Sequence, residues 1–174
     1  MSKLISSKGS KSTAFPPYGR TVCAVLFGII VISLLLLNLF THVLSVVNYY
    51  GDGMEPELHS GQTLIIAKTQ KVDEGDIVAF YYNNKVLVRR VICSGGKYID
   101  IANDGSVSIN GDIISEPYVD DPSLGQCNIQ FPYTVPYGSF FVMGDSREIA
   151  MDSRLSDVGC ISADRIIGKV VLSI

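Results

Sequence analysis

Apolar residues are concentrated in one uninterrupted run near the beginning of the chain. Residues 22–47 contain no Lys, Arg, Asp or Glu. At ~1.5 Å per residue a helix of this length exceeds the ~30 Å hydrocarbon core of a bilayer, whereas a cleavable signal has an apolar region of only ~7–15 residues. The pattern predicts a retained transmembrane anchor. A buried helix of a soluble domain is the less favoured alternative, because such helices are rarely apolar on every side.

After this run the pattern changes to short β-branched and aromatic segments separated by turn residues. Asn, Asp and Gly pairs lie between several of these segments at the spacing of β-hairpins. Proline-rich residues 117–136 are interpreted as an irregular excursion. We therefore predict a mainly β domain of antiparallel sheets over residues 48–174. Its expected strands are residues 63–67, 76–82, 85–92, 97–102, 106–109, 139–143 and 166–174.

The distribution of charged residues predicts the orientation of the anchor in the membrane. Lys3, Lys8, Lys11 and Arg20 precede the apolar run without any acidic residue, although the whole chain has a net charge of -3. The positive-inside rule predicts a cytoplasmic tail over residues 1–21 and an extracellular main domain, so a single-pass cell membrane protein. The 10 basic and 17 acidic residues after the anchor exclude a nucleic-acid partner, which requires a basic surface.

Three cysteines, Cys93, Cys127 and Cys160, lie in the exported part. Their odd number leaves the disulfide state open. No C-x-x-C spacing occurs and only one histidine, His59, follows the anchor, so the sequence predicts no metal site and no cofactor. A nucleophilic Cys-His pair with His59 is less favoured than buried cysteines of a β domain.

Three segments of the exported part resemble, in order, the motif boxes of the type I signal peptidases. These S26-like Ser-Lys peptidases are membrane-anchored and remove signal peptides from exported proteins. Residues 51–68 (GDGMEPELHSGQTLIIAK) are similar to the G-x-S-M-x-P-T-L-x-x-G-D box, and residues 86–92 (VLVRRVI) to the box ending in Lys-Arg-Val. Residues 135–161 resemble the G-D-N-R-x-x-S-x-D-S-R box. The resemblance implies a signal-peptidase-like β domain that binds extended peptide segments.

Three residues depart from the family's catalytic pattern. In the family a serine hydroxyl attacks the scissile carbonyl and a neutral lysine removes its proton. The serine position is Gly53, which has no side chain, and the lysine position is Arg89, whose pKa above ~12 leaves no neutral form near pH 7. Ala150 replaces a serine that orients the lysine. We therefore expect a pseudoenzyme, which is not an enzyme but still binds peptides.

The other matched residues are expected to support the site and its peptide cleft. An ion pair between Asp52 and Arg89 is one hypothesis for the vacated site. Ser60 as a displaced nucleophile is disfavoured, because a shift of ~1 Å in a catalytic group costs ~100-fold in rate. The supporting residues are Asp52, Met54, Pro56, Arg90, Asp145, Arg147, Asp152, Ser153 and Arg154.

Two functions follow from the resemblance. Degenerate members resemble the pilus-associated signal-peptidase-like proteins of Gram-positive bacteria, which assist sortase-mediated pilin polymerisation. This implies a membrane-anchored peptide-binding or chaperone factor in pilus assembly, with pilin subunits or sortase as partners. The alternative is an active type I signal peptidase that cleaves the signal peptides of exported preproteins, or a natural enzyme that carries engineered substitutions.

Overall fold

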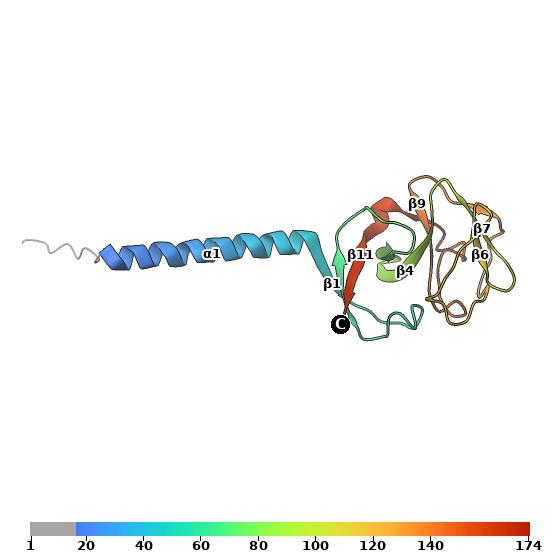
Figure 1. Cartoon of the computed structure of the whole chain (residues 1–174), viewed down its shortest axis with the longest axis horizontal. Coiled ribbons are helices and arrows are strands. Elements are labelled where there is room, and N and C mark those ends of the chain that lie inside the picture. The colour runs from blue at the N-terminus through green and yellow to red at the C-terminus, as the bar shows by residue number, and fades with distance from the viewer. Residues whose placement is uncertain (1–16) are drawn as a thin grey trace, which may run out of the picture. The chain divides into compact units, whose positions relative to one another are not determined.

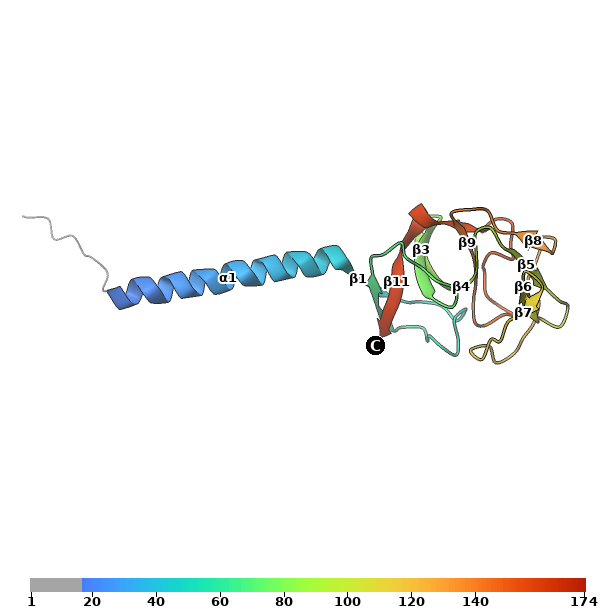
Figure 2. The same cartoon turned by 45° about the horizontal axis from the view of Figure 1, so that its top comes forward.

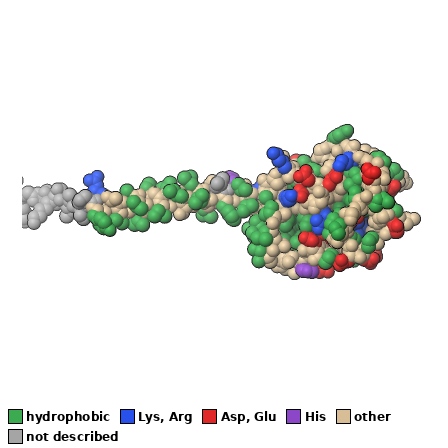
Figure 3. All heavy atoms as spheres, in the orientation of Figure 1, with side chains coloured by type: hydrophobic (Ala, Val, Ile, Leu, Met, Phe, Trp, Pro, Cys, Tyr) green, Lys and Arg blue, Asp and Glu red, His purple; other side chains and the backbone are tan. Residues whose placement is uncertain are grey.

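The computed structural model describes residues 17–174, which form a helical unit ending at Phe40 and a β unit of Thr41–Ile174 (Figure 1). Helix α1 (Pro17–Val43) carries apolar side chains along its described length (Figure 3), and its length and composition suit a membrane span. Residues 1–16, which include most of the expected cytoplasmic tail, lie outside the described part.

The helix ends earlier than the apolar run. Residues 44–47, which we expected in the anchor, belong to β1 (Leu44–Asn48). This strand pairs along its whole length with β2 (Thr63–Ala67), from Leu44 opposite Ala67 to Asn48 opposite Thr63. The physical reason is that Val46 and Val47 suit a pleated strand as well as a helix, and the available partner strand decides between the two.

The β unit contains two antiparallel sheets, which confirms the predicted mainly β fold. The larger has seven strands in the order β1-β2-β11-β3-β4-β9-β10, and the smaller has four in the order β7-β6-β5-β8. Figure 2 shows β5 to β8 at the opposite end of the unit from β1 and β11. The remaining strands are β3 (Ile77–Tyr82), β4 (Lys85–Ser94), β5 (Tyr98–Ile101), β6 (Val107–Ile109), β7 (Asp112–Ile113), β8 (Tyr133–Thr134), β9 (Ser139–Met143), β10 (Ile161–Ser162) and β11 (Ile166–Ser173), with a short 3-10 helix η1 (Ala163–Arg165).

Turn chemistry sets the hairpin registers. Asn83 and Asn84 have φ angles of 46° and 60° and join β3 to β4, with Tyr82 opposite Lys85. Asn110 joins β6 to β7 with a φ of 53°. Asparagine adopts this left-handed conformation more readily than most residues, so these predicted turns are confirmed. Within residues 117–136, only the two residues of β8 pair with β5, and the rest is irregular.

Three groups of buried apolar side chains form the core. In one of them, Met54 and Leu58 pack against Leu64 and Ile66 of β2 and against Val88 of β4. This group fixes the loop that carries Gly53 onto the large sheet, next to the middle of β4.

Candidate functional site

Two adjacent arginines of β4 direct their side chains to opposite faces of the large sheet. Arg89 lies opposite Val78 of β3, and Arg90 lies opposite Ile77 of β3 and Met143 of β9. Successive strand residues alternate in direction, so the two guanidinium groups enter different environments. Both are buried, with 6% and 8% of their surface exposed.

Arg90 has a complete set of partners. Its Nε and Nη2 donate to the two carboxylate oxygens of Asp145 at 2.9 and 2.6 Å, and its Nη1 donates to the Gly75 carbonyl at 3.0 Å. The guanidinium carbon lies 3.9 Å from the ring centre of Tyr118. Burial alone would lower the pKa of Arg90, but the Asp145 carboxylate outweighs it and raises that pKa.

Arg89 has only neutral partners. Its Nε donates to the Met151 carbonyl at 2.9 Å and its Nη1 to the Val88 carbonyl at 2.6 Å. Burial lowers the pKa of Arg89, and the nearby Asp152 carboxylate is engaged by Arg154. Within residues 17–174 no carboxylate lies within ion-pair distance of Arg89, so the hypothesised pair with Asp52 does not form.

Gly53 lies directly against this guanidinium. A Cβ atom at position 53 would lie 3.0 Å from Arg89 Nη2 and 3.2 Å from its Cζ. The arginine head therefore occupies the space into which a side chain at position 53 would extend. Gly53 also accepts a hydrogen bond from the Ser146 amide at 3.3 Å.

Ala150 and Gly53, two of the positions that depart from the family pattern, both lie against Gly144. A Cβ at Gly144 would collide with the Gly53 carbonyl oxygen and with the Ala150 Cβ. Ala150 is buried, and its amide donates to the Ser146 carbonyl at 3.1 Å. The structure thus brings Gly53, Arg89 and Ala150 into one region, as the order of the motif boxes implies.

Two ion pairs hold Gly144 in this position. Asp152 accepts the Gly144 amide at 3.0 Å and binds Arg154 through both oxygens at 2.9 and 2.8 Å. Arg147 donates Nε to the Gly144 carbonyl at 3.0 Å and binds both oxygens of Glu116 at 3.0 and 2.6 Å. Because Gly144 touches Gly53, these pairs fix the loop at the site.

The side chains of Ser153, Ser60 and His59 bond to groups other than Gly53, Arg89 and Ala150. The Ser153 hydroxyl accepts from the Val142 amide at 3.0 Å and donates to the Gly159 carbonyl at 2.8 Å. The Ser60 hydroxyl accepts from the Gly51 amide at 3.2 Å, so it closes its own loop. His59 contacts Glu55, with His59 Nδ1 3.5 Å from Glu55 Oε1.

The three thiols of the β unit have partners other than His59. Cys93 donates to the Ser94 carbonyl and Cys127 to the Ile129 carbonyl, and Cys160 interacts with Tyr133. All are free thiols.

A cleft of about 270 Å³ opens over Gly53 and Arg89. Tyr49 belongs to it and was missed from the sequence, although it stands two residues before the first motif box. Its hydroxyl is buried and makes no hydrogen bond of regular geometry. The complete lining is Tyr49, Tyr50, Gly51, Asp52, Gly53, Val86, Leu87, Val88, Arg89, Ile149 and Met151.

A second cleft of about 300 Å³ contains three of the other predicted supporting residues, whereas four line neither cleft: Arg90, Asp152, Ser153 and Arg154. Pro56, Asp145 and Arg147 line it together with exposed carboxylates. Met54 also lines neither cleft and is fully buried in the core. Among residues 17–174 no group of His, Cys, Asp and Glu is arranged to hold a metal ion.

Comparisons with known proteins agree with this arrangement. The model of the family described as signal peptidase, peptidase S26, matches residues 21–174. Signal peptidase I of Bacillus amyloliquefaciens is 36% identical over 131 residues, which cover 68% of this chain and 67% of that protein. Signal peptidase I T of Bacillus subtilis (strain 168) is 36% identical over 153 residues, covering 80% and 78%. A crystal structure of a signal peptidase I from Enterococcus faecalis V583 matches with a TM-score of 0.50 and 26% identity, covering 58% of this chain and 97% of that one.

These relatives correct one expectation. We expected a pseudoenzyme from Gly53, Arg89 and Ala150, and that prediction is wrong on this comparison, because the relatives are named as signal peptidases and so point to peptidase activity. By the match over residues 21–174 and by its relatives, the chain belongs to the signal peptidase family, peptidase S26.

Proposed function

We propose that this protein recognises exported polypeptides as extended segments that lie along β4, at the outer face of the membrane. One observation carries the proposal. β4 pairs with β9 only from Arg90 onward, so residues 85–89 have no partner strand on that side within the described chain. The cleft over Gly53 lies at this unpaired edge. An extended peptide gains affinity from backbone pairing with such an edge and specificity from neighbouring pockets.

Cleavage of the bound segment is the second candidate function, and the relatives named signal peptidase I favour it. Its reacting groups differ from a Ser-Lys pair at positions 53 and 89, because Gly53 has no side chain and Arg89 donates to two carbonyls. Incubation of the full chain in detergent with a preprotein, followed by mass spectrometry of the products, measures this activity directly. Absence of any product would leave recognition as the function.

Recognition is tested at the exposed rim of the cleft. Ile149 is 58% exposed there, and replacing it with Asp places a charge where the peptide's apolar side chains pack. We expect Ile149→Asp to weaken preprotein binding roughly tenfold, since ~1.4 kcal/mol of apolar burial corresponds to that factor. Ile113 of β7 is 78% exposed and lies outside this cleft, so Ile113→Asp is the matched control. Equal effects of both changes would refute the cleft as the binding site.

For the client we propose pilin subunits or sortase, and for the orientation a cytoplasmic N-terminus. The client is supported by the resemblance of the Gly53 and Arg89 pattern to pilus-associated members, and the orientation by the basic residues before α1 and the acidic excess after it. A photo-crosslinking residue at position 149 in the native host tests the client. Recovery of neither pilin nor sortase would exclude this assignment.

A further inference from the structure

Arg89 is an exception among the buried arginines of the β unit. A buried charge without a partner is costly, and proteins normally pair it with an opposite charge. The Arg89 side chain has two bonds to neutral carbonyls, and its Nη2 donates no hydrogen bond of regular geometry to a described residue. Every other buried arginine of the described chain binds a carboxylate through two bonds: Arg90, Arg147 and Arg154.

A second unsatisfied group lies beside it. The side chain of Tyr49 is only 5% exposed, and its hydroxyl is the single buried side-chain polar atom of the described residues without a regular hydrogen bond. Its oxygen accepts from the Arg89 guanidinium and the Met54 amide only in looser geometry, which leaves the hydroxyl proton without an acceptor. Burial raises the pKa of Tyr49, so the hydroxyl keeps its proton and remains a donor.

Both groups line the same cleft as Gly53. A Cβ at position 53 would lie 3.0 Å from Nη2, so this nitrogen lies against the Gly53 backbone, where no side chain separates it from the cleft. A guanidinium N–H and a hydroxyl donor together suit a negatively charged acceptor with two oxygens. Asp52 also lines the cleft, and because its side chain is exposed, water weakens its repulsion of an anion without removing it.

We propose that this cleft binds a carboxylate, which accepts hydrogen bonds from Arg89 Nη2 and Tyr49 Oη. The inference rests on the proposed recognition of extended peptides and names their chemistry: the segment presents a carboxylate at Gly53, either its C-terminal carboxylate or the side chain of Asp or Glu. The negative charge of Asp52 at the rim favours a singly charged carboxylate over a doubly charged phosphate.

The site is tested first with acetate alone. The full chain in detergent is melted with increasing sodium acetate, against sodium chloride and sodium phosphate of equal ionic strength. We expect the melting temperature to rise with acetate to saturation, and to rise less with phosphate. Arg89→Met should abolish the acetate effect, and Tyr49→Phe, which keeps the buried ring, should reduce it. If Arg89→Met does not fold, the smaller acetate effect of Tyr49→Phe alone tests the site.

The two sources of the carboxylate are separated with labelled decapeptides of alternating Ala and Val. One ends in a free carboxylate, one in an amide, and one in an amide with an internal Glu. We expect the free acid or the Glu peptide to bind at least tenfold more tightly than the neutral amide, because a hydrogen bond to a charged group is about twice as strong as one between neutral groups. Arg89→Met should remove this difference. Arg165→Met, which removes an arginine bonded to the Tyr81 carbonyl outside the cleft, should preserve it.

The outcomes distinguish the two proposals. Acetate stabilisation that depends on Arg89, without binding of any peptide, supports the carboxylate site and refutes peptide recognition. Equal binding of all three peptides, without an acetate effect, overturns the carboxylate site and leaves peptide recognition standing. Neither acetate stabilisation nor peptide binding overturns both.

Discussion

At the residue scale, the contact between Gly53 and Arg89 couples two positions that lie far apart in the sequence. The arginine head fills the volume beside the glycine, so a side chain at position 53 requires a smaller or displaced group at position 89. Neither residue is therefore interpretable without the other, and substitutions at the two positions should not act independently.

This coupling gives a first prediction. Gly53→Ser alone should lower the free energy of unfolding by about 1–3 kcal/mol, because overpacking displaces the Arg89 guanidinium. Arg89→Lys should relieve most of that loss, since an ammonium lacks the guanidinium's width. Urea denaturation of the four members of the cycle measures the coupling, and Gly53→Ala separates the effect of Cβ from that of the hydroxyl. Additive losses would contradict the contact.

The same substitutions bear on activity. The combination of Gly53→Ser, Arg89→Lys and Ala150→Ser supplies the hydroxyl, amine and orienting hydroxyl that the family pattern contains. We expect preprotein cleavage by this triple variant to exceed that of the parent chain. A rate no higher than the parent's would indicate that the surrounding cleft no longer presents a scissile bond to position 53.

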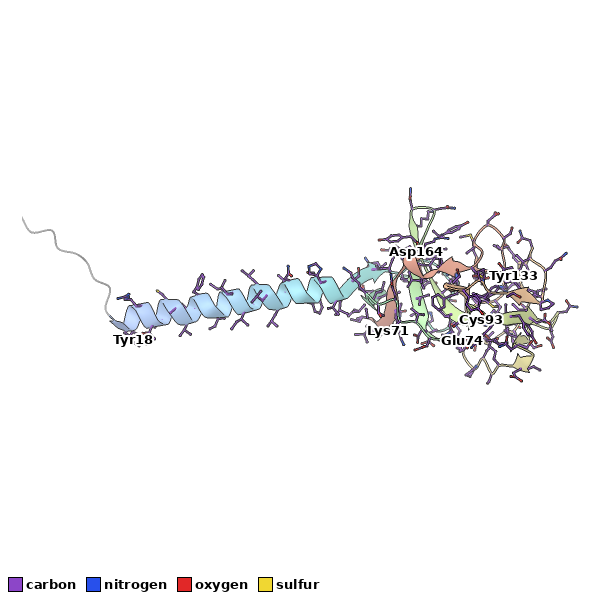
Figure 4. All side chains as sticks on the ribbon, turned by 90° about the horizontal axis from the view of Figure 1, so that it is seen from above. Tyr18, Lys71, Glu74, Cys93, Tyr133 and Asp164 are labelled. Atoms are coloured by element: carbon purple, nitrogen blue, oxygen red, sulfur yellow. The ribbon has the colours of Figure 1, made fainter. Side chains whose placement is uncertain are left out.

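The buried thiols give a prediction about pH. Burial raises the pKa of Cys93 and of Cys160 from 9.0 to about 11, and Figure 4 labels Cys93 and Tyr133 in the same part of the β unit. The native state therefore favours the protonated thiols, and this contribution to stability is present below pH 9 and lost as the pH rises toward 11. Iodoacetamide labelling of Cys160 should have its midpoint near pH 11, against ~8.5 in the chain unfolded by detergent. Equal rates at pH 8.5 would refute this.

At the scale of elements, the loop of residues 144–154 is held by charge pairs instead of by regular secondary structure. Its amides and carbonyls bind Asp152 and Arg147, and these side chains bind Arg154 and Glu116. Buried pairs of this kind position backbone more than they stabilise it, because desolvation cancels much of the attraction.

Breaking one pair should nevertheless be costly. Asp152→Asn leaves the fully buried Arg154 without its counter-charge, so we expect a loss of ~3–5 kcal/mol in unfolding free energy. Glu74→Gln is the control, because its pair with Lys97 is 30% and 41% exposed and should be worth ~0–1 kcal/mol. Circular dichroism during urea denaturation compares the two. Similar losses would mean that burial of the pair does not govern its contribution.

The sequence predicts local features of these elements better than distant partners. Strands with clear alternation and the Asn83–Asn84 turn are recognisable because their signals lie within a few residues. The boundary between α1 and β1 at Leu44 is not recognisable from the sequence, since the apolar run continues unchanged from helix into strand. The site follows the same division: Gly53 and Arg89 are visible from motif order, but the Tyr49 hydroxyl and the lack of a carboxylate at Arg89 depend on three-dimensional packing.

At the scale of the whole molecule, one apolar helix precedes an acidic β unit. With the N-terminus inside, protease added to wall-free cells should digest the β unit and protect an N-terminal tag until the membrane is permeabilised. Immunoblotting of the tag on the shortened fragment checks this topology. Protection of the β unit in intact cells would reverse the orientation.

The position of β11 has a consequence for how the protein matures. β11 follows every other described strand along the chain, yet it lies between β2 and β3 in the large sheet. Its pairs with them join residues about 86 to 109 positions apart. In the proposed orientation β2 and β3 leave the export channel early, with facing edges unpaired until Ile166–Ser173 arrives. The sheet therefore closes only after residues 166–173 have crossed the membrane, and a nascent chain arrested before residue 166 has no completed sheet beside its cleft.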